Sequence, residues 1–151
     1  MFKCVVYKCK YHQIYMYYRE ILSGVWIGDA EIMGNMKFIE DNHIGVVYNC
    51  TDIYDFPNCD ITRIRLPFST SLGSENISLI QKNHRKITTH IHEHLEHSNL
   101  LICCCDGKCV APLIVAIYIL HYGSLEPKSI YEMLLTKDNN LSLWCDLSLF
   151  Q

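Results

Sequence analysis

Residues 100–122 constrain the fold most, because an apolar strand leads through a short loop that contains a glycine into an apolar helix. Residues 100–105 have the composition of a buried strand, and residues 112–122 are apolar on all sides, as in a helix at the centre of a domain. Gly123 follows at the position of a helix C-cap. Because a buried strand joined to a buried helix is typical of α/β domains, the segment predicts that class.

The loop between this strand and this helix has the chemistry of an anion-binding turn. Amide N–H groups at a helix N-terminus point outward and carry partial positive charge, an arrangement that binds phosphate. A cysteine at the start of such a loop would have its thiolate stabilised by the same field. The residues fit a plain strand-to-helix turn with small buried cysteines equally well, so the pattern alone leaves both alternatives open.

Other segments extend the alternation of strands and helices. Strands are predicted at residues 24–28, 45–50 and 61–66, and helices at residues 29–41, 74–98 and 129–136. The strongest helix signal is an apolar stripe at three- and four-residue steps, formed by Ile77, Ile80, Ile87, Ile91 and Leu95. We expect a single α/β domain over residues 23–151, with a central sheet flanked by helices. Residues 1–22, rich in tyrosine and lysine, are expected to form a helical or irregular N-terminal arm.

Composition limits the function classes. A chain of 151 residues fits one core, and a net charge of −3 argues against general nucleic-acid binding. The nine cysteines do not suggest a disulfide framework, because their number is odd and three of them are consecutive. Lysines interrupt the apolar residues near the start, unlike a secretory signal, and the apolar run at residues 109–120 is too short to span a bilayer. We expect a reduced, cytoplasmic protein without a membrane segment.

The loop and its surroundings resemble the dual-specificity protein phosphatases. The signature of that family is histidine, the nucleophilic cysteine, two residues, glycine, two residues, arginine, and serine or threonine. Cys104 and Gly107 fall on its cysteine and glycine, and Ala116 and Tyr118 lie near the family's Ala-Tyr pair. The resemblance continues in residues 24–30 and 43–51, and in two segments similar to small poxviral members, residues 54–61 and 66–68. It implies the fold of these phosphatases.

Three chemical positions depart from the family pattern. Val110 stands at the arginine, and Cys103 stands at the histidine before the nucleophile. The general-acid aspartate falls among residues without a carboxylate, namely Ser69, Thr70 and Ser71. Losing a bidentate arginine contact costs about 2–5 kcal/mol, and losing a general acid costs about 10² to 10⁴ in rate. We therefore expect no catalytic residue and an inactive homologue, a pseudophosphatase.

The loop backbone is expected to keep its shape without the arginine. Its residues are Cys104, Cys105, Asp106, Gly107, Lys108, Cys109 and Val110. Asp106 adds a carboxylate that should oppose ionisation of Cys104, since like charge disfavours the thiolate. If Asp106 turns inward, its carboxylate closes the loop to anions; if it turns outward, a weak anion site remains.

The resemblance implies a non-catalytic, protein-binding modulator of phosphoprotein signalling, and its poxviral character implies a viral protein in the host-cell cytoplasm. The partners would be proteins, phosphorylated or not, and no cofactor, nucleic acid or membrane is expected. Small poxviral phosphatases dimerise through an N-terminal helix, so the arm of residues 1–22 is a candidate for homodimer formation. The alternative is a weakly active protein tyrosine or serine phosphatase that uses Cys104, with Lys108 as a substitute cation.

A second constellation gives a third alternative. Residues 90–94 match the H-x-x-E-H pattern of inverted zinc peptidases, and His90, His94 and His97 follow one another along a helical face. We favour a histidine-rich solvent face beside the apolar stripe, and expect no metal site. Adjacent cysteines on a strand point to opposite faces, so a zinc site made by Cys103, Cys104, Cys105 and Cys109 is not expected either.

Overall fold

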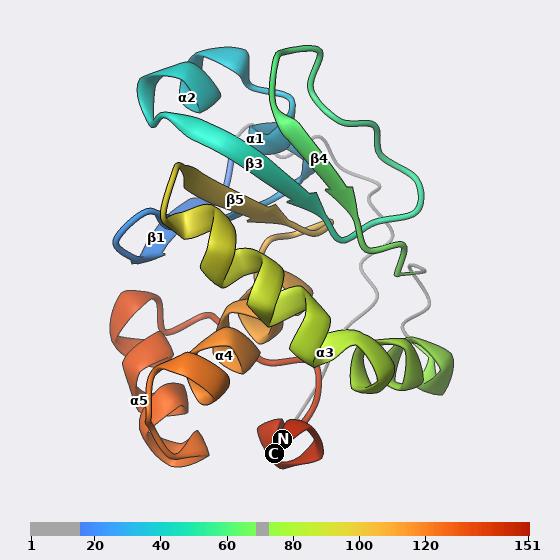
Figure 1. Ribbon diagram of the computed structural model, residues 1–151, viewed down its shortest axis with the longest axis vertical. Helices are drawn as coiled ribbons and strands as arrows, with labels where there is room; N and C mark the ends of the chain where they lie inside the picture. The colour runs from blue at the N-terminus through green and yellow to red at the C-terminus, as the bar shows by residue number, and fades with distance from the viewer. Residues whose placement is uncertain (1–15, 69–72) are drawn as a thin grey trace.

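The computed structural model describes residues 16–68 and 73–151, which form a mixed five-stranded sheet with helices on both faces (Figure 1). The strand order across the sheet is β1 (Tyr18–Leu22), β2 (Val25–Gly28), β5 (Asn99–Cys103), β3 (Ile44–Asn49) and β4 (Thr62–Arg65). β1 is antiparallel to β2, and every other neighbouring pair is parallel. The structure confirms the predicted α/β class with a central sheet between helices.

The helices divide into two layers (Figure 1). One face of the sheet carries the short helices α1 (Ala30–Met33) and α2 (Met36–Asp41). The other carries α3 (Ser74–Leu95), α4 (Val110–Tyr122), α5 (Pro127–Lys137) and the 3-10 helix η1 (Leu147–Phe150). The larger core lies on this second side, where the apolar side of α3 packs beside α4, which is buried along most of its length.

Sequence chemistry explains where these helices begin and end. The Asp29 carboxylate caps α1 by accepting from the Ile32 amide, and the Asn35 side chain caps α2 by accepting from the Phe38 amide. Gly123 caps α4 as predicted, although its φ of −93° is right-handed. Among the described residues, no helix is long and apolar enough to cross a membrane.

Two predictions need correction. Residues 18–22, assigned to the N-terminal arm, form the edge strand β1; their side chains are mostly exposed, so they carry no apolar alternation that would reveal a strand. The single helix predicted over residues 29–41 is two helices, because the chain turns at Gly34 and Asn35 starts a new helix. Residues 1–15, the rest of the arm, lie outside the described residues.

Candidate phosphate loop

The loop of residues 104–109 lies where a parallel strand ends and a buried helix begins. β5 has parallel neighbours on both sides, so the loop sits beyond the carboxyl ends of the parallel strands, where open α/β sheets commonly bind ligands. The strand ends on either side hold its first residues: the Cys104 amide donates to Gly28 O at 3.2 Å, and the Cys50 amide donates to Cys103 O at 2.8 Å. The position of the loop is thus set by the sheet.

Gly107 is required by the shape of this loop. Its φ of +72° lies in the left-handed region, which favours glycine. A Cβ at this position would lie 2.7 Å from the Gly28 carbonyl carbon and from Tyr17 Cδ1, and 2.9 Å from the Asp29 nitrogen. The signature glycine therefore keeps its structural purpose, since the loop turns sharply against β2 and its continuation.

Cys104, which the sequence resemblance places at the nucleophile position, is buried. Burial raises the pKa of its thiol to about 12, and the charge of Asp106 adds to this increase. The amides of Ala111, Cys109 and Val110 act in the opposite direction, and the Ala111 N–H donates to the sulfur at 3.4 Å. The amides at the start of α4 therefore still face the sulfur, but burial and the carboxylate outweigh them.

Asp106 is an exposed residue, but one oxygen of its carboxylate faces the loop, so neither of the two orientations considered from sequence is fully realised. Its Oδ1 accepts from the Lys108 amide at 3.0 Å and lies 3.6 Å from the Cys104 sulfur, whose thiol donates to it. A carboxylate of the chain itself is thus the acceptor for one loop amide and for the thiol. The backbone cradle is kept in part, with one of its donors already used.

The two candidate positions for positive charge do not face the loop. Val110 is buried, and its side chain belongs to the main hydrophobic core. The Lys108 ammonium lies over the ring of Tyr17, 4.8 Å from the ring centroid. The Tyr17 hydroxyl in turn donates to Asp138 at 2.7 Å. This arrangement directs Lys108 toward Tyr17 and Asp138.

Two residues that support the loop were missed from sequence. Tyr17 packs against Gly107, and its amide donates to the Asp29 carboxylate at 2.9 Å. Asp29 is nearly buried, and burial raises its pKa despite the amides that it accepts from. Its position between a strand and a helix was a recognisable N-cap signal, whereas nothing in the sequence marked Tyr17.

The consecutive cysteines at the start of the loop lie on opposite faces of the sheet. Cys103 packs with the smaller core and Cys104 with the larger one, as expected for consecutive residues of an extended strand. The described cysteines are free thiols. Ser69, Thr70 and Ser71 lie outside the described residues; the chain leads into them from Phe68, which is buried against Trp144.

The histidines of α3 take part in several local contacts. His90 Nδ1 lies 2.6 Å from the Tyr48 hydroxyl, and His94 Nδ1 lies 2.9 Å from His90 O. His97 lies past the end of α3, and the described residues hold no group of three side chains placed to share a metal ion. The structure therefore does not support the alternative of a site made by all three histidines. Elsewhere on α3, His84 Nδ1 lies 2.7 Å from His121 Nε2 of α4.

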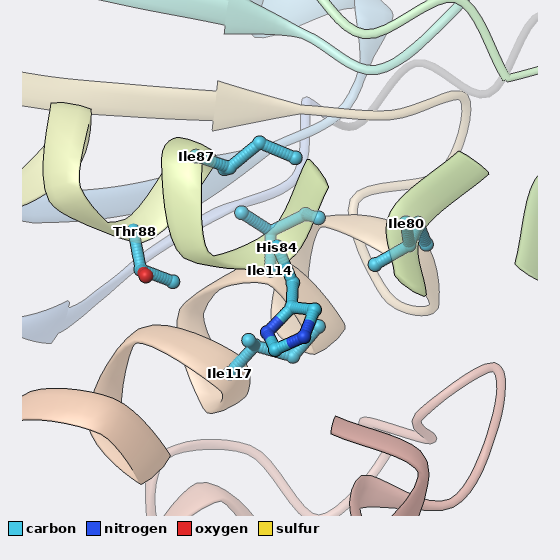
Figure 2. Close-up of a pocket in the computed structure, with 6 residues that line it drawn as sticks. All are labelled: Ile80, His84, Ile87, Thr88, Ile114 and Ile117. Atoms are coloured by element: carbon cyan, nitrogen blue, oxygen red, sulfur yellow. The ribbon is translucent and has the colours of Figure 1, made fainter. Parts of the chain in front are cut away.

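A small pocket between α3 and α4 does not belong to the loop (Figure 2). Figure 2 shows that its lining is mainly isoleucine, with His84 and Thr88 as the polar members. Such a surface has little to recognise a phosphoryl group. The loop of residues 104–109 therefore remains the candidate site.

Comparisons with known proteins agree with this architecture. DUSP15 matches with a TM-score of 0.74 and 19% identity over 89% of this chain and 85% of its own. Human DUSP28 matches with a TM-score of 0.72 and 10% identity over 89% and 90%. Human tyrosine phosphatase-like serine/threonine/tyrosine-interacting protein matches with a TM-score of 0.71 and 14% identity, over 83% of this chain and 86% of its own. No protein-family model and no curated protein matches the sequence.

These likenesses define the class of protein at the level of architecture. The chain has the fold of the dual-specificity phosphatases, with Cys104 at the start of the loop that joins β5 to α4.

Proposed function

We propose that this protein is a pseudophosphatase, a non-catalytic, protein-binding modulator of phosphoprotein signalling. The observation that carries the proposal is the Asp106 carboxylate, whose Oδ1 accepts from the Lys108 amide and from the Cys104 thiol. Phosphoryl transfer depends on donors and cations placed around the transferred group. Here a negative charge lies in the loop, and an apolar side chain, Val110, stands at the arginine position.

The cellular setting and the partners form part of the same proposal. The resemblance to small poxviral members supports a viral protein that acts in the host-cell cytoplasm. The fold also occurs in a protein named as a tyrosine phosphatase-like interacting protein, which supports a role in binding. Because Asp106 uses a loop donor, we expect recognition of partners to depend little on a phosphate in the loop.

A turnover assay tests the catalytic half of the proposal. Purified protein is incubated with a fluorogenic aryl phosphate at neutral pH, beside Cys104→Ser and an active dual-specificity phosphatase. We expect the protein and Cys104→Ser to release product at the same background rate. A rate within about a hundredfold of the active enzyme, removed by Cys104→Ser, would contradict the proposal.

A binding experiment tests the other half. Tagged protein captures partners from transfected cells, and the capture is repeated from lysate that has been treated with a broad phosphatase. We expect a defined set of proteins to be captured in both cases. The control variant Asp60→Ala, which removes an exposed carboxylate before β4, should capture the same set. Loss of every partner after phosphatase treatment would instead indicate recognition of phosphate.

The weakly active phosphatase remains a second candidate because one observation favours it. The amides of Cys109, Val110 and Ala111 still act on the Cys104 sulfur and favour its thiolate. Under this alternative, turnover would rise steeply with pH, because burial and Asp106 hold the pKa of Cys104 near 12. A Cys104-dependent rate that increases about tenfold per pH unit between pH 7 and 9 would support it.

A further inference from the structure

His90 and His94 form a close pair on the exposed side of α3. Their ring centroids are 3.9 Å apart, and the ring planes are inclined by 33°. They stand four residues apart, and side chains at this spacing lie on one helix face. The helix ends at Leu95 and Glu96 is its C-cap, so His97 lies beyond the helix and the pair is a unit of two.

The hydrogen bond of His94 fixes which nitrogen is free. His94 Nδ1 lies 2.9 Å from the His90 carbonyl oxygen, and a carbonyl oxygen can only accept. Nδ1 therefore carries the hydrogen, and the neutral ring has its lone pair on Nε2. Histidines that bind metals commonly donate their other ring N–H to a carbonyl or carboxylate in this way.

His90 is held by the protein through the same ring atom. Its Nδ1 lies 2.6 Å from the hydroxyl of Tyr48, which is 1% exposed on β3. A Tyr48 oxygen that accepts from Nδ1 leaves the lone pair of His90 on Nε2. Both rings are anchored through Nδ1, His94 by the helix backbone and His90 by the sheet, and in the His90 tautomer that carries its hydrogen on Nδ1 each ring keeps Nε2 for a ligand.

A carboxylate supplies charge next to the pair. Glu93 follows His90 by three residues, and its charge acts on both His90 and Tyr48. A bound cation would therefore sit in a favourable local field. This neighbour distinguishes the pair from His84 and His121, whose nitrogens are bonded to each other.

From this geometry we propose that His90 and His94 form a binding site for a divalent transition-metal cation of the Zn²⁺, Ni²⁺ or Cu²⁺ class, ligated by Nε2 of each ring. Imidazole suits these cations, and zinc binds histidine nitrogen at about 2.0–2.1 Å. Water, or a side chain of a bound protein, fills the other coordination positions. The site is separate from the loop of residues 104–109. Because the protein supplies two ligands, we assign the site metal binding alone.

Zinc titration of the full chain tests this proposal. ¹⁵N-labelled protein is titrated with ZnCl₂ while the imidazole nitrogens are followed by NMR. We expect the Nε2 signals of His90 and His94 to move together. We expect the double variant His90→Gln/His94→Gln to lose that response, with affinity reduced at least about tenfold.

The matched control changes two other histidines of the same segment. His92 and His97 are exposed, so His92→Gln/His97→Gln removes as much imidazole but leaves the pair intact. We expect this control to bind zinc as the unchanged protein does. Equal loss in both double variants, or binding that survives His90→Gln/His94→Gln, would overturn the proposal, the latter because other residues would then be the ligands. If the double variant does not fold, His94→Gln, which keeps the Tyr48–His90 contact, gives the same comparison.

Discussion

At the scale of single residues, Asp106 and Cys104 together support the proposal that the loop is non-catalytic. A thiol whose pKa is about 12 is ionised in about one molecule in 10⁵ at pH 7, and the thiolate is the nucleophile. The Asp106 carboxylate accepts the thiol hydrogen and adds like charge, so it favours the protonated form. The sequence showed that Asp106 lies in the loop, but its orientation depends on the Lys108 amide, which only the folded loop presents to it.

Asp106→Ala should open an anion site in the loop. The change frees the Lys108 amide and removes the repelling charge, while the amides at the start of α4 stay in place. We expect inorganic phosphate to shift the amide signals of residues 104–111 in NMR spectra of this variant, with a dissociation constant on the order of 1 mM. The unchanged protein should show no such shifts at the same concentrations.

The same variant has a second readout in the titration of Cys104. Burial remains, so the pKa should stay above the ordinary cysteine value, but loss of the carboxylate should lower it by about one pH unit. The ¹³Cβ shift of Cys104 followed against pH measures this without requiring access to the buried sulfur. Asp60→Ala is the control, and an equal effect of both substitutions would show that Asp106 does not act locally.

Val110→Arg should fail to restore activity and should destabilise the protein. Val110 is 4% exposed within the main core, so a longer charged side chain must displace its neighbours or bury its charge. Overpacking alone costs about 1–3 kcal/mol, which urea unfolding would measure, and protonation of the leaving group would still be missing. Adding Asp106→Ala and an aspartate at Ser69, Thr70 or Ser71 should do more for turnover than any single change. Near-family rates from Val110→Arg alone would contradict this account.

At the scale of elements, the sequence predicted best those helices and strands whose buried apolar residues form a clear pattern. α4 is buried along most of its length and α3 buries one stripe, so both were readable from apolar spacing, to within a few residues at their ends. β1 was not, because an edge strand with three exposed residues in a row resembles a loop in sequence. The division of residues 29–41 into α1 and α2 depends on the Asn35 cap, a local hydrogen bond that competes with the continuation of one helix.

The strand-loop-helix unit makes a prediction about glycine. Gly107→Ala should cost at least about 2 kcal/mol of the free energy of unfolding, because φ is +72° and the new Cβ would meet the backbone at Gly28 and Asp29. Gly34→Ala is the matched control, since Gly34 has a right-handed φ of −83° and a Cβ there meets only the Glu31 carbonyl oxygen, at 3.7 Å. Urea unfolding should give a lower midpoint for Gly107→Ala and little change for Gly34→Ala. Equal midpoints would mean that the loop adapts to a side chain.

At the scale of the whole molecule, distant segments meet beneath the loop in a way that no local pattern signals. Tyr17 contacts Gly107 and bonds to Asp138, which brings together the start of the described chain, the loop and the segment after α5. The layers of the fold follow from apolar periodicity, but such contacts depend on the topology of the sheet. Residue 17 is therefore part of the domain, and an arm that acts separately must end before it.

At this scale we predict self-association through the N-terminal arm. Because Tyr17 and β1 belong to the domain, the arm to be tested is residues 1–15. Residues 1–15 are rich in tyrosine, and they precede β1, which lies at an edge of the sheet with one neighbour, β2. Aromatic residues at this density commonly mark a contact surface. We expect light scattering to give a dimer for the full chain and a monomer after deletion of residues 1–15, which keeps Tyr17 and β1. Thermal unfolding should show that the shortened protein is folded, because its sheet and its loop support are intact. A monomer in both cases would reject the idea, and a dimer in both would move the interface from the arm to the domain, with the exposed edge of β1 as the first surface to test.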